Sequence, residues 1–308
     1  MGSNNKLLIV GGTGFIGSYL TNEALSRGFE VTVLSLNRNK VHPNSRHVDF
    51  LFSDITSLEK LSEVLKKNHF HHVVNLGGYI NHSNFSKGGN KIFDVHFMGL
   101  FNLIKCVNHP ELKSFIQIGS SDEYGSNTAP QNENQRELPI SPYSSAKTAA
   151  TFFLQMLHRT EDFPGVILRP FLVYGPGQDE NRFIPQIING CLGNKEFPVS
   201  QGEQLRDFCH VSDFTNAIFS SFENNNAFGE VINVASGRPI SIKEVVIMIQ
   251  KIVGTGDPKF GQIPYRDEEN MALYADISKA NKLLNWSPKI TLQDGLEATI
   301  KFQKDYSV

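Results

Sequence analysis

Tyr143 and Lys147 lie four residues apart at the start of a long predicted helix, in the segment SPYSSAK. Residues four apart share one helical face, so the phenol and the ammonium are expected to be neighbours. A positive charge beside a phenol can lower the phenol pKa from about 10 toward neutrality. Ser120 directly follows a predicted strand and is expected to hold the same substrate oxygen. Together they predict proton transfer at a sugar hydroxyl while hydride moves to or from a nicotinamide.

The alternative interpretation is a half-buried tyrosine and a solvated lysine, because this spacing alone is common in helices. A glycine-rich turn near the N-terminus favours the catalytic interpretation. Gly11, Gly14 and Gly17 follow the apolar run 7–10 and open a helical pattern. Such a strand, turn and helix suit a dinucleotide, whose pyrophosphate meets the free N–H groups and positive dipole end of the helix. The expected contacts there are Gly11, Gly14, Phe15, Ile16 and Gly17.

The end of the next predicted strand, residues 30–36, bears on which nicotinamide cofactor binds. A carboxylate there would bond the ribose hydroxyls of NAD and repel a 2′-phosphate. The chain has Ser35, Asn37 and Arg38 instead, a hydroxyl, an amide and a guanidinium that suit a phosphate. These residues predict NADP as the preferred cofactor and leave NAD as a second choice. Further cofactor contacts are expected from Asp54, Ile55, Leu76, Gly77, Tyr143 and Lys147.

Composition excludes several classes of protein. The 308 residues are 40% hydrophobic and 19% charged, with a net charge of −2, so no basic surface indicates nucleic acid as a partner. We expect no signal peptide and no membrane span, because no apolar run is long enough. The three cysteines form no C-x-x-C pair, which is typical of a reduced cytoplasmic protein. We expect no metal at the histidine-rich segment 69–72, because the sequence offers it no matched second half.

Apolar runs and amphipathic segments alternate along the first two thirds of the chain. This order predicts an α/β fold with a doubly wound parallel sheet. The expected strands are residues 7–10, 30–36, 47–52, 73–78, 114–119, 166–172 and 230–235, and the main expected helices are 53–67, 92–107, 143–159 and 241–252.

Six segments in this order resemble the extended short-chain dehydrogenase/reductase family that acts on nucleotide sugars. They read GGTGFIG, SSDEYG, PYSSAK, RPFLVYGPGQ, GEQLRDFCHVSD and ADISKANKLLNWSP. The resemblance implies a Rossmann domain, residues 1–172 and 207–236, and a smaller nucleotide-sugar lobe, residues 173–206 and 237–308. It also implies the catalytic triad Ser120, Tyr143 and Lys147. A homodimer formed through helices 92–107 and 143–159 is expected too.

The resemblance further indicates substrate contacts. Arg206 and Arg266 match arginines that contact the nucleotide diphosphate, and a surface ion pair is the alternative for each. Ser121 and Asp122 lie where the family contacts the sugar, and Asp122 occupies the position of an acid/base in dehydratases. Two positions depart from the family pattern, because His96 and Leu172 stand where asparagine is usual.

Three functions are compatible with these residues. The first is NADPH-dependent reduction of a GDP- or dTDP-linked 4-keto-6-deoxy sugar in deoxysugar or surface-polysaccharide (lipopolysaccharide) biosynthesis, which the absence of a carboxylate near Ser35 favours. The alternative is an NAD-dependent C4 epimerase, C4 dehydrogenase or 4,6-dehydratase. A remote third is a non-catalytic dinucleotide sensor on the same fold.

Overall fold

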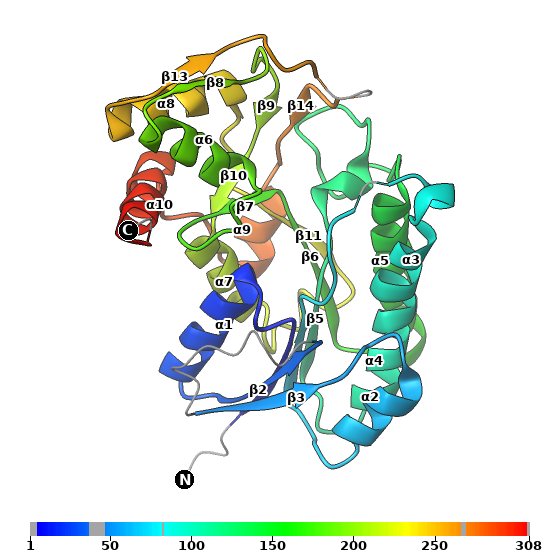
Figure 1. Cartoon of the computed structure of the whole chain (residues 1–308). Helices are drawn as coiled ribbons and strands as arrows, with labels where there is room; N and C mark the ends of the chain where they lie inside the picture. The colour runs from blue at the N-terminus through cyan, green and yellow to red at the C-terminus, as the bar shows by residue number, and fades with distance from the viewer. Residues whose placement is uncertain (1–4, 37–46, 82, 266–268, 307–308) are drawn as a thin grey trace.

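A central sheet of seven parallel strands forms the framework of the computed structural model, which describes residues 5–36, 47–81, 83–265 and 269–306 (Figure 1). The strand order is β11-β6-β5-β4-β1-β2-β3. The strands are β1 (Lys6–Val10), β2 (Glu30–Ser35), β3 (Val48–Phe52), β4 (His72–Asn75), β5 (Ser114–Ile118), β6 (Gly165–Pro170) and β11 (Val231–Val234). Unbroken apolar runs such as Leu7, Leu8 and Ile9 are fully buried, as strands covered on both faces require. The predicted doubly wound sheet is confirmed.

Helices cover both faces of this sheet (Figure 1). On one face lie α2 (Leu58–Leu65), α4 (Gly99–Val107) and α5 (Pro142–Glu161), whose Leu61, Leu103 and Leu154 share one core with the sheet. On the other face lie α1 (Phe15–Ser26), α7 (Val211–Ser220) and α9 (Ser278–Leu284). Each helix buries its apolar stripe against the sheet, which fixes the strand ends relative to the helix starts.

The helix expected over residues 92–107 is divided into three parts. It begins as α3 (Asn90–Phe93), widens into a π-helical turn (Asp94–Met98) and continues as α4. Such turns interrupt α-helices frequently at functional sites. His96 lies in this turn and is buried.

The remaining elements form a smaller lobe above the sheet (Figure 1). It contains α6 (Phe183–Leu192), α8 (Ile242–Val253), α10 (Leu292–Tyr306), the strand pair β8–β13 and the three-stranded sheet β12–β9–β14, around a separate apolar core. The short strands are β7 (Leu172–Tyr174), β8 (Glu196–Pro198), β9 (Leu205–Arg206), β10 (Phe208–His210), β12 (Ile240–Ser241), β13 (Asp257–Lys259) and β14 (Ala272–Leu273).

The division of the chain into the two domains given above stays a prediction. Within the segment 237–308, Leu284 and Trp286 pack in the core beside the sheet rather than in the lobe. The strand expected over residues 166–172 ends at Pro170, and β7 then pairs in parallel with β10. None of the described helices is long and apolar enough to cross a bilayer.

Candidate active site

The start of α5 places Tyr143 and Lys147 at the carboxyl end of β5. The helix begins there because Ser141 accepts a hydrogen bond from the backbone N–H of Ser144 (3.1 Å) and Pro142 occupies the first helical position. Tyr143 and Lys147 are both buried on the face that α5 turns toward the sheet. The Lys147 Nζ donates to the carbonyl oxygen of Ile118 at 2.7 Å and lies 5.9 Å from the centre of the Tyr143 ring.

Electrostatics at this pair differ from the sequence-based expectation. Burial, followed by the Asp122 carboxylate, raises the pKa of Tyr143 above its usual value of 10. Burial lowers the pKa of Lys147 to about 8, although the carboxylates of Glu123 and Asp122 favour its charged form. The expected lowering of the tyrosine pKa by lysine is therefore wrong for this conformation. The physical reason is desolvation, which disfavours the charged form of both groups.

Ser120 lies where the sequence predicted, beside the phenol. It caps the short 3₁₀ helix Ser121–Tyr124, because its Oγ accepts from the backbone N–H of Asp122 at 3.2 Å. A hydrogen bond between Ser120 and Tyr143 favours the phenolate and partly offsets the raised tyrosine pKa. Asp122 is half-buried and Ser121 is buried, so a carboxylate and a second hydroxyl adjoin the triad. The structure thus brings the three predicted catalytic side chains together.

The glycine turn has the shape that a dinucleotide needs. Gly11 adopts φ +79°, a conformation that other residues rarely adopt. A Cβ on Gly17 would lie 2.4 Å from the Gly11 carbonyl oxygen, so only glycine lets α1 start this close to the turn. Gly12 escaped the sequence analysis, yet a Cβ there would lie 2.7 Å from the Val33 side chain. No side chain caps α1 at Gly14, which leaves its N-terminus open toward a ligand.

The other expected cofactor contacts are only partly gathered around this turn. The end of β4 lies against it, because a Cβ on Gly11 would come within 3.2 Å of the Leu76 carbonyl and 3.4 Å of the Gly77 nitrogen. Ile55 belongs to the core under α2. Asp54 accepts from the backbone and hydroxyl of Thr56 (2.9 and 2.8 Å), which is turn chemistry; its contact with a cofactor stays a prediction.

Of the three residues that predicted NADP, the structure describes only Ser35. Ser35 is buried, and its hydroxyl is 3.0 Å from that of Thr13 in the glycine turn. This contact engages one of the hydrogen-bonding sites of the Ser35 hydroxyl within the protein. Asn37 and Arg38 lie outside the described residues.

Arg206 is placed in the lobe, as expected, but it is not free. Its guanidinium forms an ion pair with Glu269 and donates to the Leu205 carbonyl at 2.7 Å. Binding of a diphosphate by Arg206 therefore means competition with this carboxylate. Arg266 lies outside the described residues, so its role stays a prediction.

Three side chains near the triad were not assigned a role from the sequence. Glu123 and Arg169 form a fully buried ion pair (2.7 Å) directly behind Ser120. His96 packs its ring edge-to-face on Tyr143, with the two ring centres 5.1 Å apart. Burial, and next the charge of Lys147, lower the pKa of His96 to about 3, so it is neutral. The sequence shows Glu123 only as one of two adjacent acidic residues after Ser121. That it is buried is seen only in the structure.

The histidine-rich segment has more neighbours than the sequence indicated. His69 lies beside His109 and Glu111, with one ligand atom of each within 4.8 Å of the others. However, both ring nitrogens of His109 lie 3.2 Å from backbone N–H groups, those of Phe70 and Glu111. These donors compete with a cation for the imidazole lone pair, and the expectation that no metal binds there stays a prediction.

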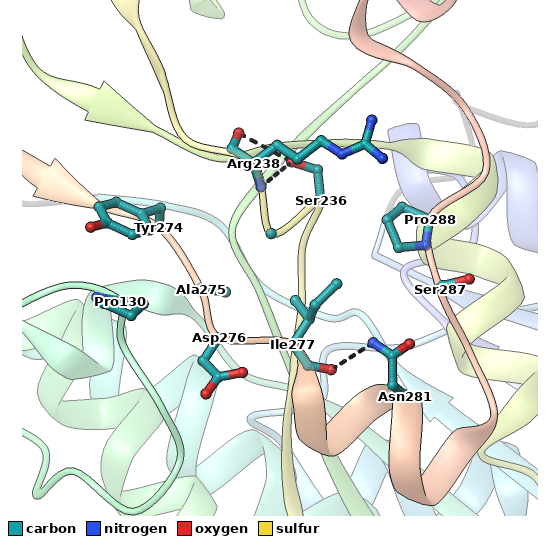
Figure 2. A pocket seen from close by; sticks show the side chains of 11 residues that line it. Pro130, Ser236, Arg238, Tyr274, Ala275, Asp276, Ile277, Asn281, Ser287 and Pro288 are labelled. Carbon is teal, nitrogen blue, oxygen red and sulfur yellow. Dashed lines mark hydrogen bonds between the residues drawn. The ribbon is translucent and has the colours of Figure 1, made fainter.

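A surface cavity of about 580 Å³ lies near α9 (Figure 2), and no residue of the triad lines it. Its lining includes one guanidinium, from Arg238, and one carboxylate, from Asp276. Ser236 and Asn281, also in the lining, have their polar groups bonded to neighbouring backbone. This mixture of charges indicates no particular class of ligand.

Comparison with known proteins agrees with this arrangement. Residues 7–235 match the model of the NAD dependent epimerase/dehydratase family. The chain belongs to this family. The predicted family and the predicted class of enzyme are confirmed, and the non-catalytic alternative loses its support.

Two proteins of similar sequence differ in their named activities. A dTDP-glucose 4,6-dehydratase of Streptomyces niveus is 28% identical, covering 97% of this chain and 93% of the relative. A UDP-glucuronate 4-epimerase of Thermodesulfobacterium geofontis is 25% identical, covering 97% of this chain and 96% of the relative.

A solved structure agrees over the whole length. The UDP-glucuronic acid 4-epimerase of Bacillus cereus, in complex with UDP-glucuronic acid and NAD, has a TM-score of 0.87 and 28% identity. The match covers 97% of this chain and 99% of that one. These comparisons favour the epimerase and dehydratase alternative over the reductase, and NAD over NADP.

Proposed function

We propose that the protein is an NAD-dependent 4-epimerase of a nucleotide-linked hexose. The observation that carries the proposal is the juxtaposition of Ser120, Tyr143 and Lys147 at the carboxyl end of β5, in a chain of the epimerase/dehydratase family. The similarity to a 4-epimerase that holds NAD supports both the reaction and the cofactor. It supports them better than the 4-keto reductase and NADP that the sequence favoured.

The residues present fit NAD. The turn from Gly11 to Gly17 would hold the pyrophosphate, because the glycines leave no Cβ between the backbone and a ligand. The buried Nδ1 of His96 has no partner among the described residues, and it faces Gly78 next to the end of β4. NAD, when bound, supplies a hydride acceptor that can return the hydride to either face of a sugar carbon.

The side chains of this chain supply the proton chemistry. The Tyr143 phenolate takes the proton of the C4 hydroxyl and becomes the neutral phenol, which returns the proton to the same oxygen after the sugar has turned. The phenolate therefore has to be present before the reaction starts. The Ser120 hydroxyl bonds the same phenol and favours this charged form. Lys147, held by the Ile118 carbonyl, adds a positive charge within the same enclosed site. Burial strengthens each of these interactions by excluding water.

A 4,6-dehydratase is the second candidate, because of Asp122. This carboxylate lies close enough for its charge to favour the protonated forms of both Tyr143 and Lys147, although burial lowers the pKa of Lys147 overall. A carboxyl group beside the sugar could move the C5 proton and assist the departure of water from C6. Ser121 beside it offers a hydroxyl instead of a second acid, which favours epimerisation.

We also propose that the enzyme is a cytoplasmic homodimer. Met98 in the π-helical turn and Phe152 and Met156 on α5 expose 42%, 50% and 37% of their surface. A second copy would cover these side chains, and Phe152→Glu should then yield monomers in light scattering. An unchanged mass would contradict the dimer.

Reduced cysteines agree with the cytoplasm, since Cys191 and Cys209 are buried and unpaired.

The cofactor is tested by releasing nucleotides from the purified protein with acid and separating them by chromatography. We expect NAD in near-stoichiometric amount. Protein without nucleotide that binds NADPH more tightly than NADH would contradict the proposal and restore the reductase.

A further inference from the structure

Glu123 lies behind the catalytic side chains and connects three elements. Its Oε1 accepts from the backbone N–H of Ser120 at 2.8 Å. Its Oε2 accepts from the Thr151 hydroxyl on α5 at 2.8 Å and from the Arg169 guanidinium on β6 at 2.7 Å. The Glu123 side chain is completely buried. A carboxylate can remain charged in such a place only when it is paired and hydrogen-bonded in this way.

The local sequence makes room for this carboxylate. A Cβ on Gly119 would lie 2.6 Å from Glu123 Oε1, so any larger residue before Ser120 would displace this carboxylate. Arg169 is also fully buried, and its guanidinium stacks 4.4 Å from the centre of the Tyr124 ring. Arg169 has a second acidic partner, Glu137, at 3.0 Å. Glu137 therefore shares the arginine, but it contacts neither Ser120 nor Thr151 through any described hydrogen bond.

Glu123 also acts on the catalytic lysine through its charge. Of the two nearby carboxylates that favour the charged form of Lys147, Glu123 has the larger effect and Asp122 the smaller. The other charged or titratable groups that face Lys147 and Tyr143 are His96 on the π-helical turn and Arg182 at the start of α6. The charged or titratable groups around Glu123 itself are Arg169 and its two further neighbours, Glu137 and Tyr124.

We propose that Glu123 is a positioning residue of the active site, which fixes Ser120 through its backbone and places a carboxylate beside Lys147. Arg169 holds the carboxylate in place from behind. The inference rests on the proposed active site, because it assigns Glu123 a role through Ser120 and Lys147. A purely structural ion pair would have no such effect on the lysine.

The matched pair Glu123→Gln and Glu137→Gln tests the proposal, since each removes one carboxylate from Arg169. The titration of Lys147 is followed in protein with ¹³C-labelled lysine, from the NMR signal of its ε-methylene group, which Lys147→Arg identifies. In the wild type the midpoint is expected near pH 8. Glu123→Gln should lower it by about one pH unit, because an adjacent opposite charge shifts a pKa by that order. Glu137→Gln should leave it unchanged.

Activity provides the second measurement. We expect Glu123→Gln to lower kcat about 10- to 100-fold with little change in KM, as misplacement of a catalytic group does. Glu123→Asp keeps the charge but shortens the reach to Ser120, so its Lys147 midpoint should stay near the wild-type value while kcat falls. This variant also serves if Glu123→Gln fails to fold.

Two results would overturn the proposal. One is an equal shift of the Lys147 midpoint in both glutamine variants, and the other is wild-type kcat in Glu123→Asp. Failure of the proposed function is separate from these results. A wild-type protein inactive on every nucleotide sugar would contradict the epimerase, while the lysine titration would still decide the role of Glu123.

Discussion

The Lys147 ammonium donates a 2.7 Å hydrogen bond to the carbonyl of Ile118, the last residue of β5. This bond ties the first turns of α5 to the carboxyl end of β5. In the sheet, β4 separates β5 from β1, the strand that leads into the glycine turn. It also buries a positive charge, which lowers the pKa of Lys147 to about 8. The position of the lysine is therefore maintained at a cost in stability that depends on pH.

The buried lysine predicts a specific dependence of stability on pH. Its folded pKa is below the value of 10.5 for free lysine, so the unfolded chain binds more protons between about pH 8 and 10.5. The cost of burying the charge is complete below pH 8 and fades as the pH rises to 10.5. Lys147→Met should therefore have a higher Tm than the wild type at pH 7, and the difference should shrink by pH 10. Parallel Tm curves would contradict this, and Lys251→Met, at an exposed position, is the control.

Removal of the Tyr143 hydroxyl should abolish most activity. Tyr143→Phe keeps the ring and its contact with His96 but cannot carry a proton. We expect kcat to fall by about 10²–10⁴, the usual contribution of a general acid or base. NAD affinity, measured by fluorescence titration, should change little. Near-normal turnover in this variant would show that another group transfers the proton.

A side chain added to the glycine turn should weaken cofactor binding. In Gly17→Ala the new Cβ would lie 2.4 Å from the Gly11 carbonyl oxygen, so α1 would have to move away from the turn. We expect NAD affinity to fall at least about tenfold, because the helix N-terminus would no longer meet the pyrophosphate. Gly193→Ala is the matched control, since it lies outside the turn with φ −65° and no atom closer than 3.3 Å. Equal NAD affinity in both variants would argue against the site.

Substitutions of Arg206 and Glu269 should change KM for the nucleotide sugar in opposite directions. Arg206→Ala should raise KM for the nucleotide sugar about tenfold or more, because a hydrogen bond to a charged group contributes roughly 1.5–3 kcal/mol. Glu269→Gln should lower KM, since it removes the carboxylate that competes for the guanidinium. NAD affinity should stay constant in both variants. A rise of KM in Glu269→Gln would instead mean that the pair is needed to shape the lobe.

The sequence was sufficient for the parts of the fold that local patterns specify. Apolar runs located the strands of the sheet, and the helix expected over residues 241–252 matches α8 (Ile242–Val253). The spacing of Tyr143 and Lys147 was sufficient to place both side chains on one buried face of α5. Each of these features depends on residues close together in the chain.

Features that depend on distant residues were not predictable in this way. The burial of Ser35 and its contact with Thr13 follow from the meeting of β2 with the glycine turn, which the sequence around Ser35 does not show. The pKa of Tyr143 depends on how completely α5 and its neighbours exclude water, which spacing does not show. The pairing of Glu123 with Arg169 joins residues 46 positions apart.

The central claim is tested most directly by incubating the purified enzyme with UDP-glucose, UDP-glucuronate and dTDP-glucose, each without added cofactor. Proton NMR of the sugar signals then reports the product. We predict that a 4-epimer accumulates from one of these substrates, with no net change in the absorbance of NADH. A 4-keto-6-deoxy product would make the enzyme a dehydratase through Asp122. No turnover of any hexose, together with stoichiometric oxidation of NADPH by a nucleotide 4-keto-6-deoxy sugar, would contradict the account.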